Sequence, residues 1–422
     1  MRIQHPGRFA LGLLPLLILI GAAAYVFDHY HPLDYLPRET WGPYLQDVRS
    51  DEITIAWKSK SDKRGFVAWG PDRRRPTFRK EGRRELHAVR LRGLDPGNTY
   101  WYRVNDGGSW LGEWRQFRTA PVPGAPAEFV FAALGDSGDG SSRAWEVAYG
   151  LARAKPDLLI HTGDVVYPSG LARDYGRGLF EPFHHLLALV PMYPTMGNHD
   201  TGPTGGKAFR EIFALPVNDE DGGSDYYSFD YGDVHFTCLN SNSRVASLRP
   251  GSPQRRWLER DLSRSRARWK IVFFHHPPFS ATARAGRGRL RGIVPLLERM
   301  GVSLVLNGHA HAYERTRPIR TTREGHPVVY VITGGGGGGL IDVGRGPNTA
   351  FSRRAYHFVL VRVTPQALHL SAIDPRSGKA FDRAVILPPR ALQSGSPLLP
   401  SAREEAPERR PSPWTRGPAK TG

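Results

Sequence analysis

Residues 41–119 carry short apolar runs in which hydrophobic and polar positions alternate, and polar clusters separate one run from the next. The runs are rich in β-branched and aromatic residues, and this alternation is typical of strands that bury one face. Strands are predicted at 53–59, 65–70, 86–93, 98–106 and 113–119, with turns at SDKRG, GPDRRRP, LDPGN and DGGS. Several short strands in roughly eighty residues predict a small two-sheet β-sandwich.

From residue 128 onward, strand-like apolar runs alternate with longer helix-like segments. Strands are predicted at 128–134, 157–162, 269–274, 302–307 and 328–333, and helices at 143–155, 179–190 and 292–300. Residues 226–240 predict a hairpin that turns at Gly232. This alternation predicts an α/β layered domain with some antiparallel strands.

Five polar clusters each directly follow an apolar run: GDSG (135–138), GDVVY (163–167), GNHD (197–200), HHPPF (275–279) and GHAH (308–311). In open α/β sheets, ligands bind beyond the carboxyl ends of the strands, so these clusters should meet if their strands are neighbours. The clusters supply carboxylate, amide, imidazole and phenol groups, enough for two metal ions that share a bridging ligand. The pattern predicts a hydrolase that acts on phosphate esters.

The 422-residue chain has the composition of an ordinary globular protein, with 40% hydrophobic and 23% charged residues. Its net charge of +18 suits an anionic partner such as a phosphorylated small molecule or ester, although an arginine-rich genome and a basic tail would give the same balance. No compact Lys/Arg run with interleaved aromatic residues is present, so nucleic-acid binding is not expected. The single cysteine, Cys238, excludes a disulfide within the chain.

Basic residues near the N-terminus precede an apolar stretch from Phe9 to Phe27, which predicts a cleaved secretory signal or an uncleaved signal-anchor. The rest of the chain is therefore expected to be periplasmic, extracellular, or anchored to the outer side of the cytoplasmic membrane. The predicted division has six parts: signal segment 1–28, connector 29–40, β-sandwich 41–120, proline-rich linker 121–127, α/β domain 128–387 and disordered tail 388–422.

The five clusters, with VFFH before a proline and GHAHAYER, resemble the motifs of the purple acid phosphatases within the calcineurin-like metallophosphoesterases. The resemblance covers about residues 41–387 and implies an α/β (α+β) metallophosphoesterase sandwich. The turn in LDPGNTY resembles that of a fibronectin type III domain, which implies a domain of this type before the sandwich. Tyr167, three residues after Asp164, indicates the purple branch, in which this phenolate binds a ferric ion.

The resemblance implies two metal ions held by seven side chains: Asp136, Asp164, Tyr167, Asn198, His275, His309 and His311. Fe(III) would be held by four of them, Asp136, Asp164, Tyr167 and His311, because phenolate and carboxylate are hard anionic donors. Asn198 and the two remaining histidines would hold a divalent ion such as Zn, Fe or Mn, with Asp164 as the bridge. An extended GHAH segment would direct His309 and His311 to the same side of the chain.

The resemblance also implies an acid phosphatase that hydrolyses phosphate monoesters by attack of a metal-bound hydroxide, without a covalent phospho-enzyme. Asn198 and His199 would contact the substrate phosphate, and His199 would help to protonate the leaving group unless it only braces its loop. His276 is a second catalytic candidate. Plant members have a further histidine downstream of the position of His275, where this chain has arginines; of these, Arg284 is a candidate phosphate ligand.

Two other functions remain open at this point. A phosphodiesterase or nucleotide hydrolase would use the same metal centre, because substrate loops vary independently of the metal ligands. A non-catalytic phosphate-binding surface protein would use the β-sandwich for adhesion, but the presence of all seven ligand residues argues against it. The glycine run 334–339 lacks the Lys-Ser/Thr of a nucleotide-binding P-loop and predicts a tight loop beside the metal ions.

Overall fold

The computed structural model describes residues 40–217, 223–282 and 290–389 of the chain. The predicted signal segment, nearly all of the predicted connector and tail, and Arg284 therefore lie outside the described residues. None of the helices in the described ranges has the length and apolar character that a membrane span requires.

The N-terminal part is an antiparallel sheet of five strands: β1 (Trp41–Gln46), β2 (Glu52–Gly70), β3 (Thr77–Arg92), β4 (Thr99–Asn105) and β5 (Arg115–Arg118). The all-β prediction is confirmed, but the turn predicted at SDKRG is wrong, because β2 runs through this segment. Lys63 there pairs with Arg84 of β3, so the strand ladder satisfies backbone groups of the segment. The first part of β2 pairs with β1 and its last part with β4, so one strand replaces the two predicted.

The next part of the chain contains a six-stranded sheet. Its strands are β6 (Phe129–Leu134), β7 (Leu158–His161), β8 (Met192–Pro194), β16 (Phe358–Val363), β17 (Leu368–Ile373) and β18 (Ala380–Ile386). Their order is β18-β17-β16-β6-β7-β8, and β6, β7 and β8 are parallel to one another. The loops that follow these three strands therefore leave the sheet at the same edge.

A second, seven-stranded sheet belongs to the same part of the chain. Its strands are β9 (Tyr227–Tyr231), β10 (Val234–Cys238), β11 (Trp269–Phe273), β12 (Leu304–Asn307), β13 (Tyr313–Thr316), β14 (Val329–Thr333) and β15 (Thr349–Arg353). The order is β15-β13-β14-β12-β11-β10-β9, and β10, β11, β12 and β14 are parallel. The hairpin predicted to turn at Gly232 is confirmed as β9 and β10.

Helices connect these strands: α2 (Ser142–Ala154), α3 (Glu181–Leu187), α4 (Asn198–Thr201), α5 (Lys207–Ile212), α6 (Pro253–Arg264) and α7 (Val294–Arg299), with a π-turn before α3 (Gly176–Phe180) and a 3-10 turn before α7 (Arg291–Ile293). Serine caps begin the longer helices, since Ser141 Oγ accepts from Ala144 N and Ser252 Oγ from Arg255 N. The sequence did not predict α6, because PQRRWLERDLSR is mostly polar and buries only a narrow apolar stripe.

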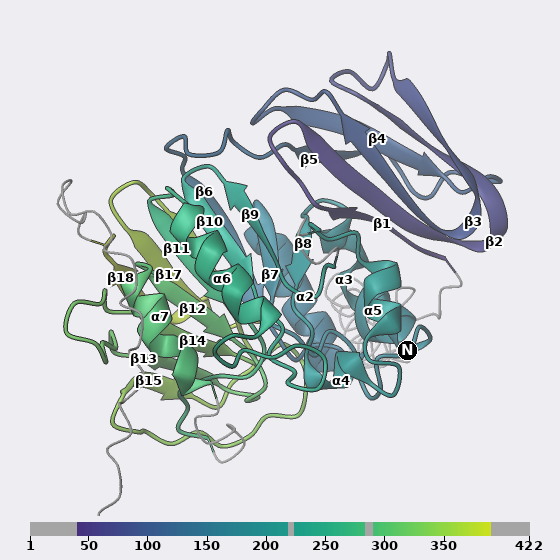
Figure 1. Ribbon diagram of the computed structural model, residues 1–422. Helices are drawn as coiled ribbons and strands as arrows, with labels where there is room; N and C mark the ends of the chain where they lie inside the picture. The colour runs from purple at the N-terminus through teal and green to yellow at the C-terminus, as the bar shows by residue number, and fades with distance from the viewer. Residues whose placement is uncertain (1–39, 218–222, 283–289, 390–422) are drawn as a thin grey trace, which may run out of the picture. The chain divides into compact units, whose positions relative to one another are not determined.

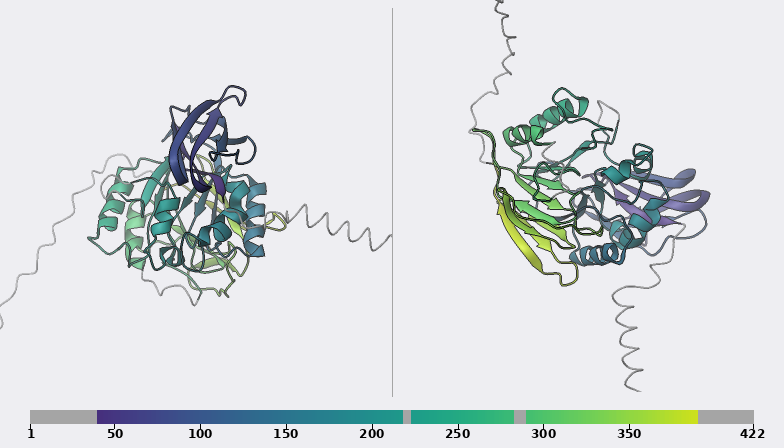
Figure 2. Two further views of the ribbon diagram at one scale, coloured as in Figure 1. Left: turned by 90° about the vertical axis from the view of Figure 1, so that its right-hand side faces the viewer. Right: turned by 90° about the horizontal axis from the view of Figure 1, so that it is seen from below.

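The two sheets pack face to face, and α6 and α7 cover the outer face of the seven-stranded sheet (Figure 1, Figure 2). Alternate residues of the central strands of the seven-stranded sheet enter different cores, as the period of two in a strand requires. Ile271 and Phe273 of β11 belong to the core between the sheets. Val272 belongs to a second core, which the seven-stranded sheet forms with α6 and α7. Both faces of these parallel strands are thus buried, which leaves their ends for polar chemistry.

Buried tyrosines join the N-terminal sheet to the α/β part. Tyr44 donates to Ile212 O at 2.8 Å, and Tyr102 donates to Ala188 O at 2.6 Å. In the opposite direction, Tyr193 of β8 donates to Val48 O at 2.7 Å. Since β8 leads into the GNHD cluster, the N-terminal sheet packs against the strand that positions this cluster.

Candidate metal centre

All five polar clusters follow parallel strands, as predicted, but these strands belong to two sheets. GDSG, GDVVY and GNHD come after β6, β7 and β8, whereas HHPPF and GHAH come after β11 and β12. The clusters of the two sheets are joined directly, because His275 Nδ1 donates to Thr162 O at 2.9 Å. His309 N also donates to Asp136 Oδ2 at 2.9 Å. The carboxyl ends of both sheets therefore form one site.

One half of this site gathers around the Tyr167 hydroxyl, which lies 3.1 Å from His311 Nε2, 3.4 Å from Asp136 Oδ1 and 3.3 Å from Asp164 Oδ2. His311 Nε2 also lies 3.4 Å from Asp136 Oδ1. The four side chains predicted to hold the ferric ion thus come together from three loops.

The other half gathers around Asn198 Oδ1, which lies 3.1 Å from His275 Nε2 and 3.1 Å from His309 Nδ1. His275 Nε2 lies 3.4 Å from Asp164 Oδ2, so Asp164 contacts both halves, as a bridging ligand would. One donor atom from each of Asp136, Asp164 and His275 lies within 4.8 Å of the others. All seven predicted ligands therefore form one cluster, and their binding of metal ions stays a prediction.

The GHAH segment differs from its predicted extended shape. His309 has a φ of 68°, in the left-handed region, and Ala310 N bonds to Gly308 O at 2.8 Å. The predicted extended shape is therefore wrong; both histidines still reach the cluster, and the turn sends them to its two different halves. Asp136 and Asp164 also have left-handed backbones, with φ of 59° and 49°. Such conformations concentrate at functional sites, where the surrounding structure holds them.

Asp200 ties two of the loops together. Its buried carboxylate accepts N–H groups of Val165 at 3.1 Å, Val166 at 3.1 Å and Gly197 at 2.7 Å. Burial raises the pKa of Asp200 to about 7, against the effect of these three donors. Asp200 stands inside GNHD, so its position in that cluster is the one feature of the sequence that points to it; its bracing role has no local pattern.

His161 and Ser137 connect the end of β7 to the GDSG loop and so support the site. His161 Nε2 lies 2.8 Å from Ser137 Oγ, and His161 Nδ1 accepts from Gly163 N at 3.3 Å. Burial lowers the pKa of His161 to about 3, so the imidazole is neutral and Nε2 carries the proton donated to Ser137. Sequence reasoning missed His161, because a histidine at the end of an apolar run has no distinguishing pattern.

The glycine run 334–339 lies beside the site, as predicted. Gly336 N donates to Gly135 O at 3.0 Å and Gly338 N donates to Asp136 O at 2.8 Å. A Cβ at Gly334 would lie 2.8 Å from Asp136 Oδ2 and 2.2 Å from Ala310 O. The run therefore lets backbone approach a candidate ligand more closely than any side chain would permit.

Two of the imidazoles already have the orientation of metal ligands. His275 Nδ1 donates to Thr162 O and His311 Nδ1 donates to Gly339 O at 2.8 Å, so each Nε2 is directed at the other donors. Metal-binding histidines in proteins commonly donate their second N–H to a carbonyl in this way.

The charges of the site also fit cations. Asp136 and Asp164 are buried, and within the described ranges their ion pairs are with histidines alone. Burial would lower the pKa of His275, but the Asp164 and Asp136 carboxylates raise it to about 9. Burial and the same carboxylates raise the pKa of Tyr167, so a phenolate there requires a nearby cation. The donor set fits a hard trivalent ion in one half and a divalent ion in the other.

His199 and His276, the predicted catalytic residues, lie beside different halves of the cluster. His199 Nδ1 donates to Pro168 O at 2.8 Å, and its ring centre lies 4.6 Å from that of Tyr167. His276 Nδ1 lies 2.8 Å from Ser241 Oγ, and its ring centre lies 4.5 Å from that of His309. Arg284, the remaining predicted substrate ligand, lies outside the described residues.

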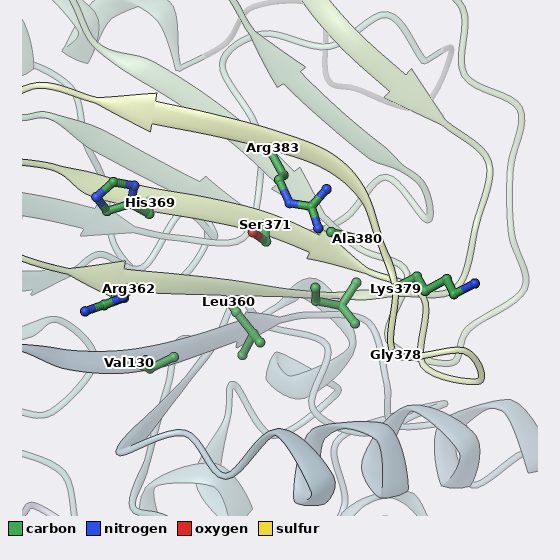
Figure 3. Close-up of a pocket in the computed structure, with 10 residues that line it drawn as sticks. Val130, Leu360, Arg362, His369, Ser371, Gly378, Lys379, Ala380 and Arg383 are labelled. Atoms are coloured by element: carbon green, nitrogen blue, oxygen red, sulfur yellow. The ribbon is translucent and has the colours of Figure 1, made fainter.

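Two cavities differ in their relation to this cluster. One, of about 1020 Å³, is lined by Asn198, His276 and His309. The other, of about 660 Å³, lies over β6, β16, β17 and β18, where Leu360, Ser371 and Arg383 stand on neighbouring strands (Figure 3). Predicted site residues line the first cavity and none lines the second, so the first adjoins the cluster.

Family models match two parts of the chain. Residues 43–119 match the purple acid phosphatase N-terminal domain, and residues 129–313 match the calcineurin-like phosphoesterase domain. The chain is 30% identical over 290 residues to purple acid phosphatase 15 of Arabidopsis thaliana, and the match covers 60% of this chain and 53% of that protein. It is 28% identical over 311 residues to acid phosphatase type 7 of Mus musculus, covering 66% of this chain and 67% of that protein. The chain thus spans between about half and two thirds of these relatives.

Solved structures share the fold. A purple acid phosphatase from yellow lupin seeds superimposes with a TM-score of 0.71 at 21% identity, covering 83% of this chain and 74% of that chain. PhoD superimposes with a TM-score of 0.61 at 16% identity, covering 83% of this chain and 89% of that chain. At these identities the likeness shows a common architecture.

Proposed function

The chain belongs to the purple acid phosphatase family of calcineurin-like phosphoesterases, and on this premise we propose that it is an exported, binuclear metal-dependent acid phosphatase for phosphate monoesters. The observation that carries the proposal is the convergence of seven metal-ligand side chains from five loops where β6, β7, β8, β11 and β12 end. When bound, a pair of cations neutralises phosphate charge and activates water for in-line attack on phosphorus.

The residues of the two halves have separate roles in this proposal. Asp136, Tyr167 and His311 hold Fe(III), while Asn198, His275 and His309 hold the divalent ion, with Asp164 shared. Asn198 is exposed and lines the larger cavity, so it also contacts the substrate phosphate. The backbone carbonyls behind His275 and His311 keep their proton on Nδ1 and so keep Nε2 free for a cation.

His199 is proposed to donate a hydrogen bond to the substrate phosphate. Its Nδ1–H is held by Pro168 O, so Nε2 is the nitrogen that a substrate can reach. Donation from Nε2 while Nδ1 also donates requires the protonated ring.

His276 is proposed to protonate the leaving group from the cavity side. The Ser241 hydroxyl accepts a hydrogen bond from the backbone N–H of His276 at 3.0 Å, and it lies 2.8 Å from His276 Nδ1. The form of His276 that can give up a proton is the protonated ring, in which Nδ1–H donates to the Ser241 hydroxyl and Nε2–H is left for the leaving group. Ser241 therefore positions this ring beside the site.

The proposed reaction is tested with p-nitrophenyl phosphate and bis(p-nitrophenyl) phosphate at acidic pH, on metal-loaded and chelator-treated protein. We expect hydrolysis of the monoester by the loaded protein only. Faster hydrolysis of the diester would favour the phosphodiesterase alternative. Hydrolysis of neither ester by protein with two bound metal ions would favour a phosphate-binding protein.

The ferric assignment is tested by the visible spectrum of the metal-loaded protein. Iron bound to the Tyr167 phenolate gives a charge-transfer band, and Tyr167→Phe should remove it while the fold persists, since Tyr167 contributes one hydroxyl to the cluster. The two proteins are compared by absorption and by metal analysis. A band that persists in Tyr167→Phe would contradict the assignment.

Export is proposed from the sequence of residues 1–28. In a Gram-negative host, the full chain should fractionate with the periplasm or the membrane, and a form that lacks these residues should stay in the cytosol. N-terminal sequencing of the exported form distinguishes a cleaved signal from an anchor. Equal distribution of both forms would contradict export through this segment.

A further inference from the structure

We propose that Arg244 and Arg249 form a subsite for a second phosphate group, so that the substrate is an ester of an alcohol that carries two phosphates. This inference rests on the phosphatase function proposed above. It names the substrate class of the same site.

The cavity beside the cluster has room for more than the group that reacts. Its volume is about 1020 Å³, and pockets that enclose whole small molecules measure roughly 300–1,000 Å³. Asn198 and His309 line it, whereas Tyr167 and His311 do not. The part of the substrate beyond the reacting phosphate therefore lies on the side of the Asn198–His309 half.

The charged side chains of the cavity wall are basic. Arg244 and Arg249 line it, and no aspartate or glutamate of the described residues does. Two arginines elsewhere in this domain are paired: Arg210 with Asp225 at 2.6 Å and Arg255 with Glu259 at 2.8 Å. Both cavity arginines are exposed, and in the part of the chain that the structure describes neither forms an ion pair with a carboxylate. Their guanidinium groups are available to a ligand.

The loop that carries both arginines is fixed at each end. It follows β10, which is parallel to β11, so it leaves the seven-stranded sheet beside HHPPF. Asn242 Nδ2 donates to Met196 O at 3.0 Å, which joins the loop to the GNHD segment. Ser252 Oγ donates to Ser247 O at 2.7 Å, and Gln254 Oε1 accepts from Asn240 N at 2.7 Å. The subsite is thus attached to the loop of a candidate ligand.

Two guanidinium groups without a nearby carboxylate suit a dianion. The planar donor fork of arginine binds phosphate oxygens in pairs, and these charge-assisted bonds are stronger than neutral ones. Leu248, Leu290 and Ile293 also line the cavity and suit the carbon skeleton that joins two phosphates. A single phosphate at the metal centre would leave both arginines unused.

The test compares butyl phosphate with butanediol bisphosphate, which differ by one phosphate, by release of inorganic phosphate from the metal-loaded enzyme. We expect kcat/KM to be higher for the bisphosphate by about 10-fold or more. The double variant Arg244→Gln/Arg249→Gln should lose this preference and keep the wild-type rate on butyl phosphate. The control is Arg299→Gln, which removes one positive charge from an exposed residue of α7 that does not line the cavity. This variant should keep the preference for the bisphosphate.

Binding gives a second readout that does not depend on turnover. Calorimetry with butylphosphonate and butane bisphosphonate should show the same preference and the same loss in the double variant. Equal affinity and equal rates for the paired ligands would overturn the subsite while leaving the phosphatase function intact, as would an equal effect of Arg299→Gln. Failure to hydrolyse any ester would overturn the proposed function, and the binding preference would still decide whether the subsite exists.

Discussion

Among the described residues of the α/β part, two buried histidines each lie among carboxylates, and the two clusters differ in what holds them together. In the first, His275 lies among the carboxylates of Asp136 and Asp164; in the second, His235 lies between Asp230 and Asp261. In both cases carboxylates raise the pKa of the histidine to about 9, against the opposing effect of burial. The charge around each histidine is similar, so charge alone does not distinguish them.

Hydrogen bonding distinguishes the two clusters. His235 Nδ1 bonds to Asp230 at 2.7 Å, and His235 Nε2 bonds to Asp261 at 3.0 Å. The hydroxyls of Ser228 and Thr237 also donate hydrogen bonds to the Asp261 carboxylate, at 2.6 and 2.9 Å. One imidazole separates the two carboxylates and satisfies both. In the first cluster the donors converge on each other at 3.1–3.4 Å, and two carboxylates share one side of His275. The converging donors of the first cluster would be completed by the cations of the proposed function, whereas the His235 cluster is complete by itself.

The largest effect is expected at Asp164, which contacts both halves of the first cluster. Asp164→Ala should lose both metal ions and lower kcat/KM on p-nitrophenyl phosphate by at least about 10³-fold, since the charge that clamps the phosphate is lost. Metal analysis and steady-state kinetics measure both. The matched variant Asp261→Ala in the second cluster should keep both metal ions, and full activity in Asp164→Ala would contradict the shared-ligand assignment.

The next largest effect is expected at His276 and depends on the leaving group. His276→Gln should lower kcat on butyl phosphate by about 10²-fold, because an alkoxide needs a proton to leave. Its effect on p-nitrophenyl phosphate should be small, since p-nitrophenolate leaves without one. His369→Gln, an exposed histidine of the other cavity, is the control. Equal losses on both esters would indicate that His276 serves the site in another way.

Much of the first cluster could be predicted from the sequence, because each ligand follows a strand-like run and ligand types are recognisable within GDSG, GDVVY, GNHD, HHPPF and GHAH. The separation of the strands into two sheets was not predictable, because pairing between distant strands leaves no local pattern. The left-handed backbone of His309 was also missed, since such a conformation is imposed by tertiary contacts.

Bracing residues were the least predictable part. Asp200 and His161 act through backbone N–H groups and a serine of other loops, so their partners are far away in sequence. The loop with Arg244 and Arg249 has no strong motif, and its place beside the cluster follows from the parallel pairing of β10 with β11. The SDKRG turn was wrongly predicted because its turn-forming composition was overridden by pairing with β3.

A smaller effect is expected from the glycine run, and it offers a matched pair. Gly334→Ala places a methyl group 2.8 Å from Asp136 Oδ2, whereas a Cβ at Gly339 meets nothing within 4 Å. Gly334→Ala should therefore displace Asp136 and lower metal affinity and kcat/KM by about 10–100-fold, the range for residues that orient metal ligands. Gly339→Ala should match the wild type. Metal titration and kinetics compare the three proteins, and equal behaviour of both variants would contradict the close approach.

The least effect on activity is expected from the second cluster, whose role is stability. The folded-state pKa of His235 is raised from 6.5 to about 9, so its stabilisation is complete below about pH 6.5 and disappears as the pH rises through 9. His235→Gln should keep its activity at acidic pH while losing stability there. The difference in unfolding free energy between wild type and variant should shrink by about 3 kcal/mol between pH 6 and pH 9.5, at about 1.4 kcal/mol per pKa unit. Urea denaturation of both metal-loaded proteins measures this difference in unfolding free energy. Metal binding stabilises both proteins alike, so its contribution cancels. A difference that stays constant with pH would show that His235 is not charged in the folded protein.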